Sequence, residues 1–194
     1  MRVIPTRRLN LVPVREENAE TLWQVLQQPD LRDFQDLPDL DAAAFRRNIA
    51  QRPKELRAAA IGRFEWMIYW RGTDASKPLG WVSLRIAERA TETAEIGYSV
   101  VREHRGRGVA TEAVAALVAE GFERAQLARV RAYCVPENAS SRAVLERNGF
   151  LDQGVARHGA TVQGQAVDVV GYVLMRGRWL SLRNLTPSRS ATQS

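Results

Sequence analysis

The stretch HRGRGVATEA, residues 104–113, alternates glycine with arginine and then runs directly into an apolar, helix-favouring sequence. Glycine lets backbone amides approach a ligand without a Cβ in the way. The first amides of a helix lack internal partners, and the helix dipole is positive at that end. Together these features predict a phosphate-binding loop, to which Arg105 and Arg107 add positive charge.

Three other interpretations of this loop conflict with its sequence. A P-loop requires lysine followed by serine or threonine after the last glycine, and GRGVAT has neither in place. A dinucleotide-binding loop requires glycine or alanine where Thr111 stands, with an acidic residue about 20 positions further on. An RNA-binding arginine–glycine tract would be repeated and disordered, whereas this one occurs once beside an amphipathic helix. A basic turn before a core helix stays open as the simplest interpretation.

Length and composition are those of one ordinary globular domain. The chain has 194 residues, a hydrophobic fraction of 45% and a net charge of +6. It has no apolar run near the roughly 18 residues that span a membrane, and no long apolar segment at its N-terminus that would indicate a secretory signal. The single cysteine, Cys134, fits a reducing compartment. We therefore expect a cytoplasmic protein with no membrane partner and, with only two histidines, no metal.

Hydrophobic periodicity predicts a mixed α/β domain whose front half is antiparallel. Strands are expected at residues 8–14, 64–70, 79–86, 93–101, 128–135, 152–159 and 165–176. Helices are expected at residues 15–28, 39–51, 109–123 and 138–150. A single domain is expected over residues 1–180, followed by a basic, polar and disordered tail over residues 181–194.

Two segments in this order resemble the GNAT superfamily of acyl-CoA N-acyltransferases. The family's phosphate loop reads Arg/Gln-x-x-Gly-x-Gly/Ala, and Arg105, Gly108 and Ala110 occupy these positions. Residues 136–150, PENASSRAVLERNGF, are similar to its second coenzyme-contacting segment. The matching residues are Asn138, Ser141, Val144, Leu145, Glu146, Gly149 and Phe150. The sequences EIGYSV and DVVGYVLMRGRW resemble the Rim-type branch, which acetylates the N-termini of ribosomal proteins.

The resemblance implies a GNAT fold, with acetyl-CoA as the cosubstrate. About six or seven strands would form a mixed sheet whose central strands splay apart, flanked by about four helices. The coenzyme's pyrophosphate would bind the loop amides, and its pantetheine arm would follow the strand that ends in YSVV. An amide near Val100 would then polarise the thioester carbonyl. The expected coenzyme-binding residues are Val100, Arg105, Gly106, Arg107, Gly108, Val109, Ala110, Thr111, Asn138 and Ser141.

The same resemblance implies two catalytic residues. Glu95 is the candidate general base, acting on the amine directly or through water. Ser141 is the candidate general acid for the thiolate, because the tyrosine that many members use corresponds to Leu145 here. Tyr133 and Cys134 are the fallback acids. Glu95 could instead be a solvated strand residue, and Ser141 a helix-start residue that bonds backbone amides.

The acceptor amine is less specified than the coenzyme. The Rim-type resemblance implies an N-terminal α-amine, such as that of a ribosomal protein. Aminoglycosides, polyamines and amino acids stay open as acceptors, and so does a non-catalytic module that binds acetyl-CoA or RNA. Direct nucleic-acid binding is not required for acetyl transfer, and a homodimer stays open.

An acidic segment, PDLRDFQDLPDLD at residues 29–41, is expected to line the acceptor groove. A mostly cationic amine would be concentrated by such a segment, with Asp33 and Asp36 as the main participants. The simpler alternative is that these aspartates form turns, and that Asp39 or Asp41 caps the next helix.

Overall fold

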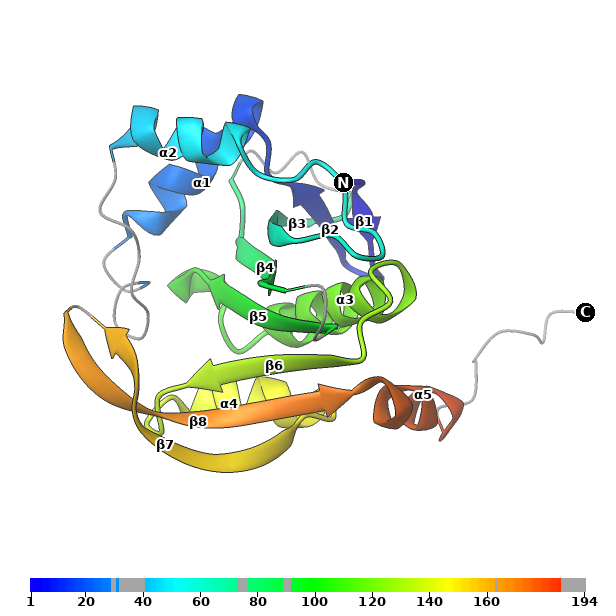
Figure 1. Ribbon diagram of the computed structural model, residues 1–194. Helices are drawn as coiled ribbons and strands as arrows, with labels where there is room; N and C mark the ends of the chain where they lie inside the picture. The colour runs from blue at the N-terminus through cyan, green and yellow to red at the C-terminus, as the bar shows by residue number, and fades with distance from the viewer. Residues whose placement is uncertain (29–30, 32–40, 73–76, 89–91, 163, 186–194) are drawn as a thin grey trace, which may run out of the picture.

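The computed structural model describes residues 1–28, 31, 41–72, 77–88, 92–162 and 164–185 (Figure 1). One mixed sheet runs through them in the strand order β1-β2-β3-β4-β5-β6-β8-β7. The strands are β1 (Ile4–Pro5), β2 (Leu9–Pro13), β3 (Gly62–Trp70), β4 (Gly80–Ile86), β5 (Thr93–Val100), β6 (Arg129–Cys134), β7 (Leu151–Val162) and β8 (Gln165–Met175). The helices are α1 (Ala19–Leu26), α2 (Ala42–Ala50), α3 (Val109–Glu123), α4 (Ala139–Arg147) and α5 (Arg176–Leu185), with 3₁₀ turns η1 (Glu16–Asn18) and η3 (Arg102–His104).

Every strand and helix expected from the sequence is present, and the described residues add two more elements. β1 pairs with β2 over two residues, which is too short for an alternating pattern. α5 is held by Trp179, whose ring lies 5.1 Å from that of Phe122 between centroids. Residues 181–185, expected in the disordered tail, are therefore helical. Eight strands and five α-helices replace the expected six or seven strands and about four helices.

The sheet is antiparallel from β1 to β5 and opens between β5 and β6. These two strands run parallel, with α3 as the crossover between them. Only Thr93–Glu95 of β5 pair with β6, opposite Arg129–Arg131, although β5 continues to Val100. Figure 1 shows the two arrows separating toward their tips. The expected splay of the central strands is confirmed, and it leaves backbone groups of β5 without a strand partner on this side.

The buried residues form two clusters on opposite faces of the sheet. Phe64, Trp66 and Ile68 of β3 belong to the cluster that includes α3 and α4. Met67, between them, belongs to the cluster that includes α1 and α2. Because side chains alternate along a strand, these two helix pairs cover opposite faces. We call them the α3 face and the α1 face.

Helix ends follow the sequence closely. Asp41 caps α2, with its Oδ1 accepting a hydrogen bond from the amide of Ala44 at 2.6 Å. Gly149 follows α4 with φ of 82°, a left-handed conformation that suits glycine just past a helix. α3 spans the residues predicted for it, so the glycine-rich loop leads directly into its first turn.

Candidate active site

The glycine-rich loop leaves the start of α3 open. Gly106 and Gly108 have φ of 73° and 75°, which glycine adopts at little cost. Gly108 is the N-cap residue, and in the described part of the chain no side chain caps this helix. The amides of Val109, Ala110 and Thr111 have no intrahelical partner, because they belong to the first turn. They lie at the positive end of the dipole, where an anion binds.

The one acidic residue in this first turn, Glu112, is neutralised by its neighbours. Its Oε2 accepts from Arg8 Nε at 2.7 Å, and its Oε1 accepts from the Arg8 amide at 2.8 Å and from Thr6 Oγ1 at 2.6 Å. Burial raises the pKa of Glu112, but the hydrogen bonds from Thr6 and Arg8 outweigh it and hold the pKa below its ordinary value. The Arg8 guanidinium offsets the negative charge of Glu112, which would otherwise repel a phosphate.

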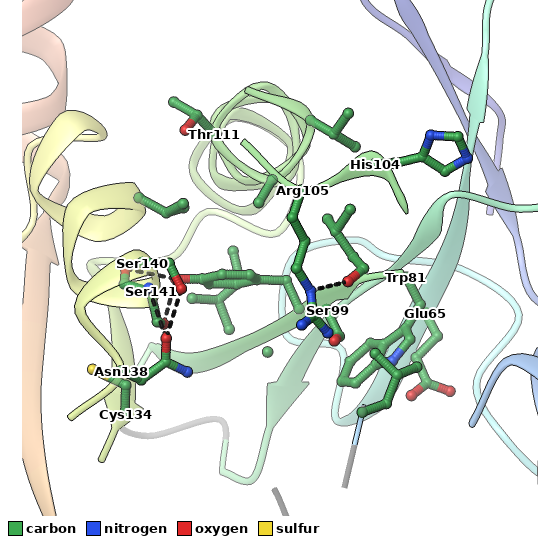
Figure 2. A pocket seen from close by; sticks show the side chains of 18 of the residues that line it. Glu65, Trp81, Ser99, His104, Arg105, Thr111, Cys134, Asn138, Ser140 and Ser141 are labelled. Carbon is green, nitrogen blue, oxygen red and sulfur yellow. Dashed lines mark hydrogen bonds between the residues drawn. The ribbon is translucent and has the colours of Figure 1, made fainter. Parts of the chain in front are cut away.

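A cavity of about 630 Å³ opens where β5 and β6 part, and both faces of the sheet contribute to its wall (Figure 2). The candidate residues that line it are Glu95, Val100, Arg105, Gly106, Gly108, Val109, Ala110, Thr111, Asn138 and Ser141. Arg107 is not among the lining residues, and its carbonyl accepts from Arg8 Nη1 at 3.0 Å. Asp33 and Asp36 lie outside the described residues.

The backbone at the end of β5 faces the opening. The amide of Val101 donates to the carbonyl of Leu79 at 2.9 Å, so it points toward β4. Successive peptide groups of a strand point to opposite sides, which directs the Val100 amide away from β4 and into the opening. The Val100 carbonyl accepts from Arg105 Nε at 2.8 Å, drawn as a dashed line in Figure 2. An amide so directed can bind a carbonyl oxygen of a ligand.

Ser141 is anchored at the start of α4 and contacts a tyrosine that sequence reasoning missed. Asn138 Oδ1 accepts from the Ser141 amide at 3.0 Å and from Ser140 Oγ at 2.9 Å (Figure 2). The hydroxyl of Tyr98 lies 2.9 Å from Ser141 Oγ and donates to the Ser141 carbonyl at 3.1 Å. Burial raises the pKa of Tyr98 far above its ordinary value, and the Ser141 contact offsets only part of that rise. Tyr98 therefore keeps its proton and orients the serine hydroxyl.

The two fallback acids also reach the cavity. Cys134 is buried, and this burial raises the pKa of its thiol, while a hydrogen bond with Ser141 acts in the opposite direction. Tyr133 precedes it on β6 and is 46% exposed. Both residues line the cavity, but adjacent residues of a strand point to opposite faces, so of the two only Cys134, a member of the α3-face cluster, lies on the same side as Ser141.

Glu95 reaches the cavity from the α1 face. Residues alternate along β5, and the buried side chains of Ala94 and Ile96 belong to the α3-face cluster, which places Glu95 on the other side. Its Oε2 accepts from Arg85 Nη2 at 2.7 Å, and its side chain is 41% exposed. A proton acceptor and a proton donor thus face the opening from opposite sides of the sheet.

A second group on the α1 face had no sequence signal. Glu65 is buried in the cavity wall and pairs with Arg52 and Arg63. Trp81 lies diagonally across from it on β4 and is 3% exposed. The residues of this group come from the segment that follows α2, from β3 and from β4, so no contiguous sequence motif contains them.

Comparison with known proteins assigns the fold to a family. The model of the acetyltransferase (GNAT) domain matches residues 8–151, which is well over half of the chain. The chain belongs to the GNAT acetyltransferase family. Members of this family use acetyl-CoA, and the loop, the open first turn of α3 and the splayed strands are the parts that would receive it.

Named relatives lie in the same family. YdaF of Bacillus subtilis (strain 168) is 40% identical over 100 residues, or 52% of this chain and 55% of YdaF. The ribosomal-protein-serine acetyltransferase of Escherichia coli (strain K12) is 34% identical over 76 residues, 39% of this chain and 42% of that protein. The aligned part of the chain therefore spans about half the length of these relatives. A solved structure of RimL, a ribosomal L7/L12 α-N-protein acetyltransferase in complex with coenzyme A, has a TM-score of 0.75. It is 20% identical, with 90% of this chain and 98% of that one covered, so it shares the fold.

Two kinds of feature are absent from the described residues. None of the helices is both long and apolar enough to cross a membrane. The same residues contain no group of three or more histidine, cysteine or carboxylate side chains arranged to hold a metal ion.

Proposed function

We propose that the protein transfers the acetyl group of acetyl-CoA to a primary amine by direct attack. The observation that carries the proposal is the uncapped N-terminus of α3 at the wall of a cavity that opens between β5 and β6. Acetyl-CoA supplies a thioester, an acyl group already activated for attack. The chain supplies an anion site at one end of the cavity and an inward-facing amide near Val100 at the other.

Each candidate residue has a role that its position supports. The amides of Val109–Thr111, with Arg105 beside them, bind the pyrophosphate. The Val100 amide binds the carbonyl oxygen and stabilises the negative charge that develops on it, a contribution of about 3 kcal/mol in comparable sites. Glu95 accepts the proton that the amine loses, directly or through water. Ser141 donates a proton to the departing sulfur as the C–N bond forms and the C–S bond breaks.

The acceptor proposed first is the N-terminal α-amine of a protein. This finer assignment is supported by the names of two relatives that act on ribosomal proteins. A small amine is the second candidate, because the cavity itself does not exclude one. Attraction of the amine by Asp33 and Asp36 stays a prediction, as do the cytoplasmic location and a homodimer.

The test is release of free thiol from acetyl-CoA by the purified protein with a panel of amines. The panel contains peptides with free and blocked N-termini, polyamines, aminoglycosides and amino acids. The proposal expects thiol release that matches the amount of acetylated amine, and no transfer to blocked peptides. Binding of acetyl-CoA without thiol release for any amine would contradict it and favour a non-catalytic module.

A further inference from the structure

The α1 face of the sheet carries a grid of side chains in front of the opening. Strand register places Arg63, Arg85 and Glu95 in one row across β3, β4 and β5. The next row is Glu65, Ser83 and Gly97, and the third is Met67, Trp81 and Ser99. Neighbouring strands lie roughly 5 Å apart, so Arg63 and Glu95 are separated by about 10 Å of backbone. If the amine of an acceptor lies at Glu95, a group a few atoms away in the same acceptor can therefore reach Arg63.

Glu65 cannot balance both of the arginines that touch it. Its side chain is 7% exposed and forms ion pairs with Arg52 Nη1 and with Arg63 Nε, the latter at 3.0 Å. The N–H of Arg63 does not point along that contact, so its Nε has no hydrogen bond within the described residues. Arg52 is further held by Asn48, whose Oδ1 accepts from its Nε and Nη2. The group therefore carries one positive charge more than Glu65 balances, and both arginines line the cavity.

Trp81 adds a buried donor without a partner. Its side chain lines the cavity, and its Nε1 has no hydrogen-bond partner among the residues described. The Arg63 guanidinium carbon lies 5.9 Å from the centre of the Trp81 ring. Leaving a buried N–H unsatisfied is costly, and buried donors are nearly always paired. Arg63 and Trp81 both line the cavity, and an unpaired indole N–H near a guanidinium matches an acceptor group with negative charge.

The electrostatics of the arginines agree with this geometry. Burial lowers the pKa of Arg63, and the nearby Arg85 lowers it further, while Glu95 acts in the opposite direction. Burial also lowers the pKa of Arg52 to about 10, with Arg63 contributing. A bound anion would offset the electrostatic repulsion between Arg63 and the neighbouring Arg52 and Arg85.

We propose that Arg63 and Trp81 form a carboxylate subsite of the acceptor pocket. This inference rests on the proposed acetyl transfer and names the class of acceptor, an amine with a carboxylate a few atoms away. Such a carboxylate is either the side chain of an acidic residue near a peptide N-terminus or the α-carboxylate of a free amino acid. The subsite selects the acceptor and takes no part in the transfer of the acetyl group.

The experiment compares pairs of acceptors, one with and one without this charge, with kcat/KM referred to the concentration of unprotonated amine. One pair is a peptide amide beginning Ala-Glu and the same peptide beginning Ala-Gln. The other pair is alanine and alaninamide. For wild-type protein we expect kcat/KM to favour the acidic member of one pair by about tenfold or more, mostly through KM. The pair that shows the preference identifies the source of the carboxylate.

Variants test whether the preference for the acidic acceptor depends on Arg63 and Trp81. Arg63→Gln should reduce the preference to less than about twofold, through a lower kcat/KM for the acidic member, while the affinity for acetyl-CoA stays unchanged. Trp81→Phe keeps the ring and removes the N–H, and should reduce the preference by a few fold. Arg57→Gln removes an equal charge from an exposed arginine, 75% exposed, and should change nothing.

The outcomes separate the two proposals. Equal kcat/KM for both members of both pairs, with thiol release intact, would overturn the subsite and leave acetyl transfer standing. A preference that survives Arg63→Gln would also overturn the subsite. Absence of thiol release for every acceptor would overturn the proposed function itself.

Discussion

The two sides of the opening between β5 and β6 are lined by different kinds of chemical group. On the α3 face the wall includes backbone groups, short side chains and Arg105 from two short stretches, within residues 105–111 and 138–141. On the α1 face it consists of long, paired side chains from separate elements, with Glu65 buried between two arginines. The first side suits a ligand that is the same for the whole family. The second suits a ligand that differs from one member to the next.

This contrast explains where specificity can vary. Backbone amides cannot be replaced by ordinary mutation, so a phosphate site made from them keeps its chemistry as sequences diverge. Side chains on a sheet face can be exchanged singly, because each occupies its own position in the strand register. The predictions below probe the two sides in order of the size of effect expected.

The largest effect is expected at the buried ion pairs of the α1 face. Glu65→Ala should lower the free energy of unfolding by about 3–5 kcal/mol, because it leaves the largely buried Arg52 guanidinium without its carboxylate. Chemical denaturation measures this. Glu123→Ala is the matched control, since that carboxylate is 51% exposed and pairs with Arg183. It should cost less than about 1 kcal/mol, and equal losses for the two variants would show that the Glu65 pairs are not a structural unit.

The next effect concerns the start of α3. Ala110→Glu should weaken acetyl-CoA binding by at least about 100-fold, or about 2.8 kcal/mol, because it brings a carboxylate to the phosphate site. The fold should persist, since an acidic residue in the first turn favours the helix. Ala115→Glu places the same charge on the exposed side of α3. If calorimetry gave both variants the same affinity for acetyl-CoA, the assignment of the phosphate site to the start of α3 would be wrong.

A smaller effect is expected at the start of α4. Ser141→Ala should lower kcat by about 100-fold, the lower end of the range for lost proton transfer, with the affinity for acetyl-CoA nearly unchanged. Ser140→Ala is the control, because that hydroxyl bonds the Asn138 side chain and not Tyr98. A loss of affinity equal to the loss of kcat would make Ser141 a binding residue.

The smallest effect concerns Glu112, whose pKa is held below its ordinary value of 4.5. A carboxyl with a depressed folded-state pKa stabilises the fold above the pKa of the unfolded chain, and this contribution disappears as pH falls through the folded-state pKa. Glu112→Gln should therefore cost less than about 1 kcal/mol at pH 7, a size appropriate to a partly exposed pair. The difference from wild type should shrink as the pH falls below 4.5 and vanish below the folded-state pKa, where both side chains are neutral. A difference that does not change as the pH falls would assign the effect to packing.

Sequence reasoning succeeded where the determining residues are local. The loop glycines, the bounds of α3, the Asp41 cap and the glycine after α4 all follow from short-range rules. The splay of β5 from β6 came from family resemblance, and the strand pairing confirms it. Arg107 stands inside the motif but is not among the residues that line the cavity, and it lies between two glycines in the left-handed conformation.

Contacts between distant segments could not be predicted in the same way. Tyr98 meets Ser141 across 43 positions of sequence, and only the tertiary fold brings the start of α4 to this residue of β5. Arg63, Glu65 and Trp81 share a face only through the register of β3 with β4. Alternation along each strand could have placed them on the α1 face, but the register between strands is a tertiary property.

The central claim is that acetyl-CoA enters from the α3 face and presents its sulfur at the opening between β5 and β6. A crystal structure of the protein with coenzyme A tests it most directly. The account predicts pyrophosphate oxygens within hydrogen-bond distance of the Val109–Thr111 amides, and the sulfur between the Val100 backbone and the Ser141 hydroxyl. Pyrophosphate bound away from α3, or a sulfur that does not reach the opening, would contradict it.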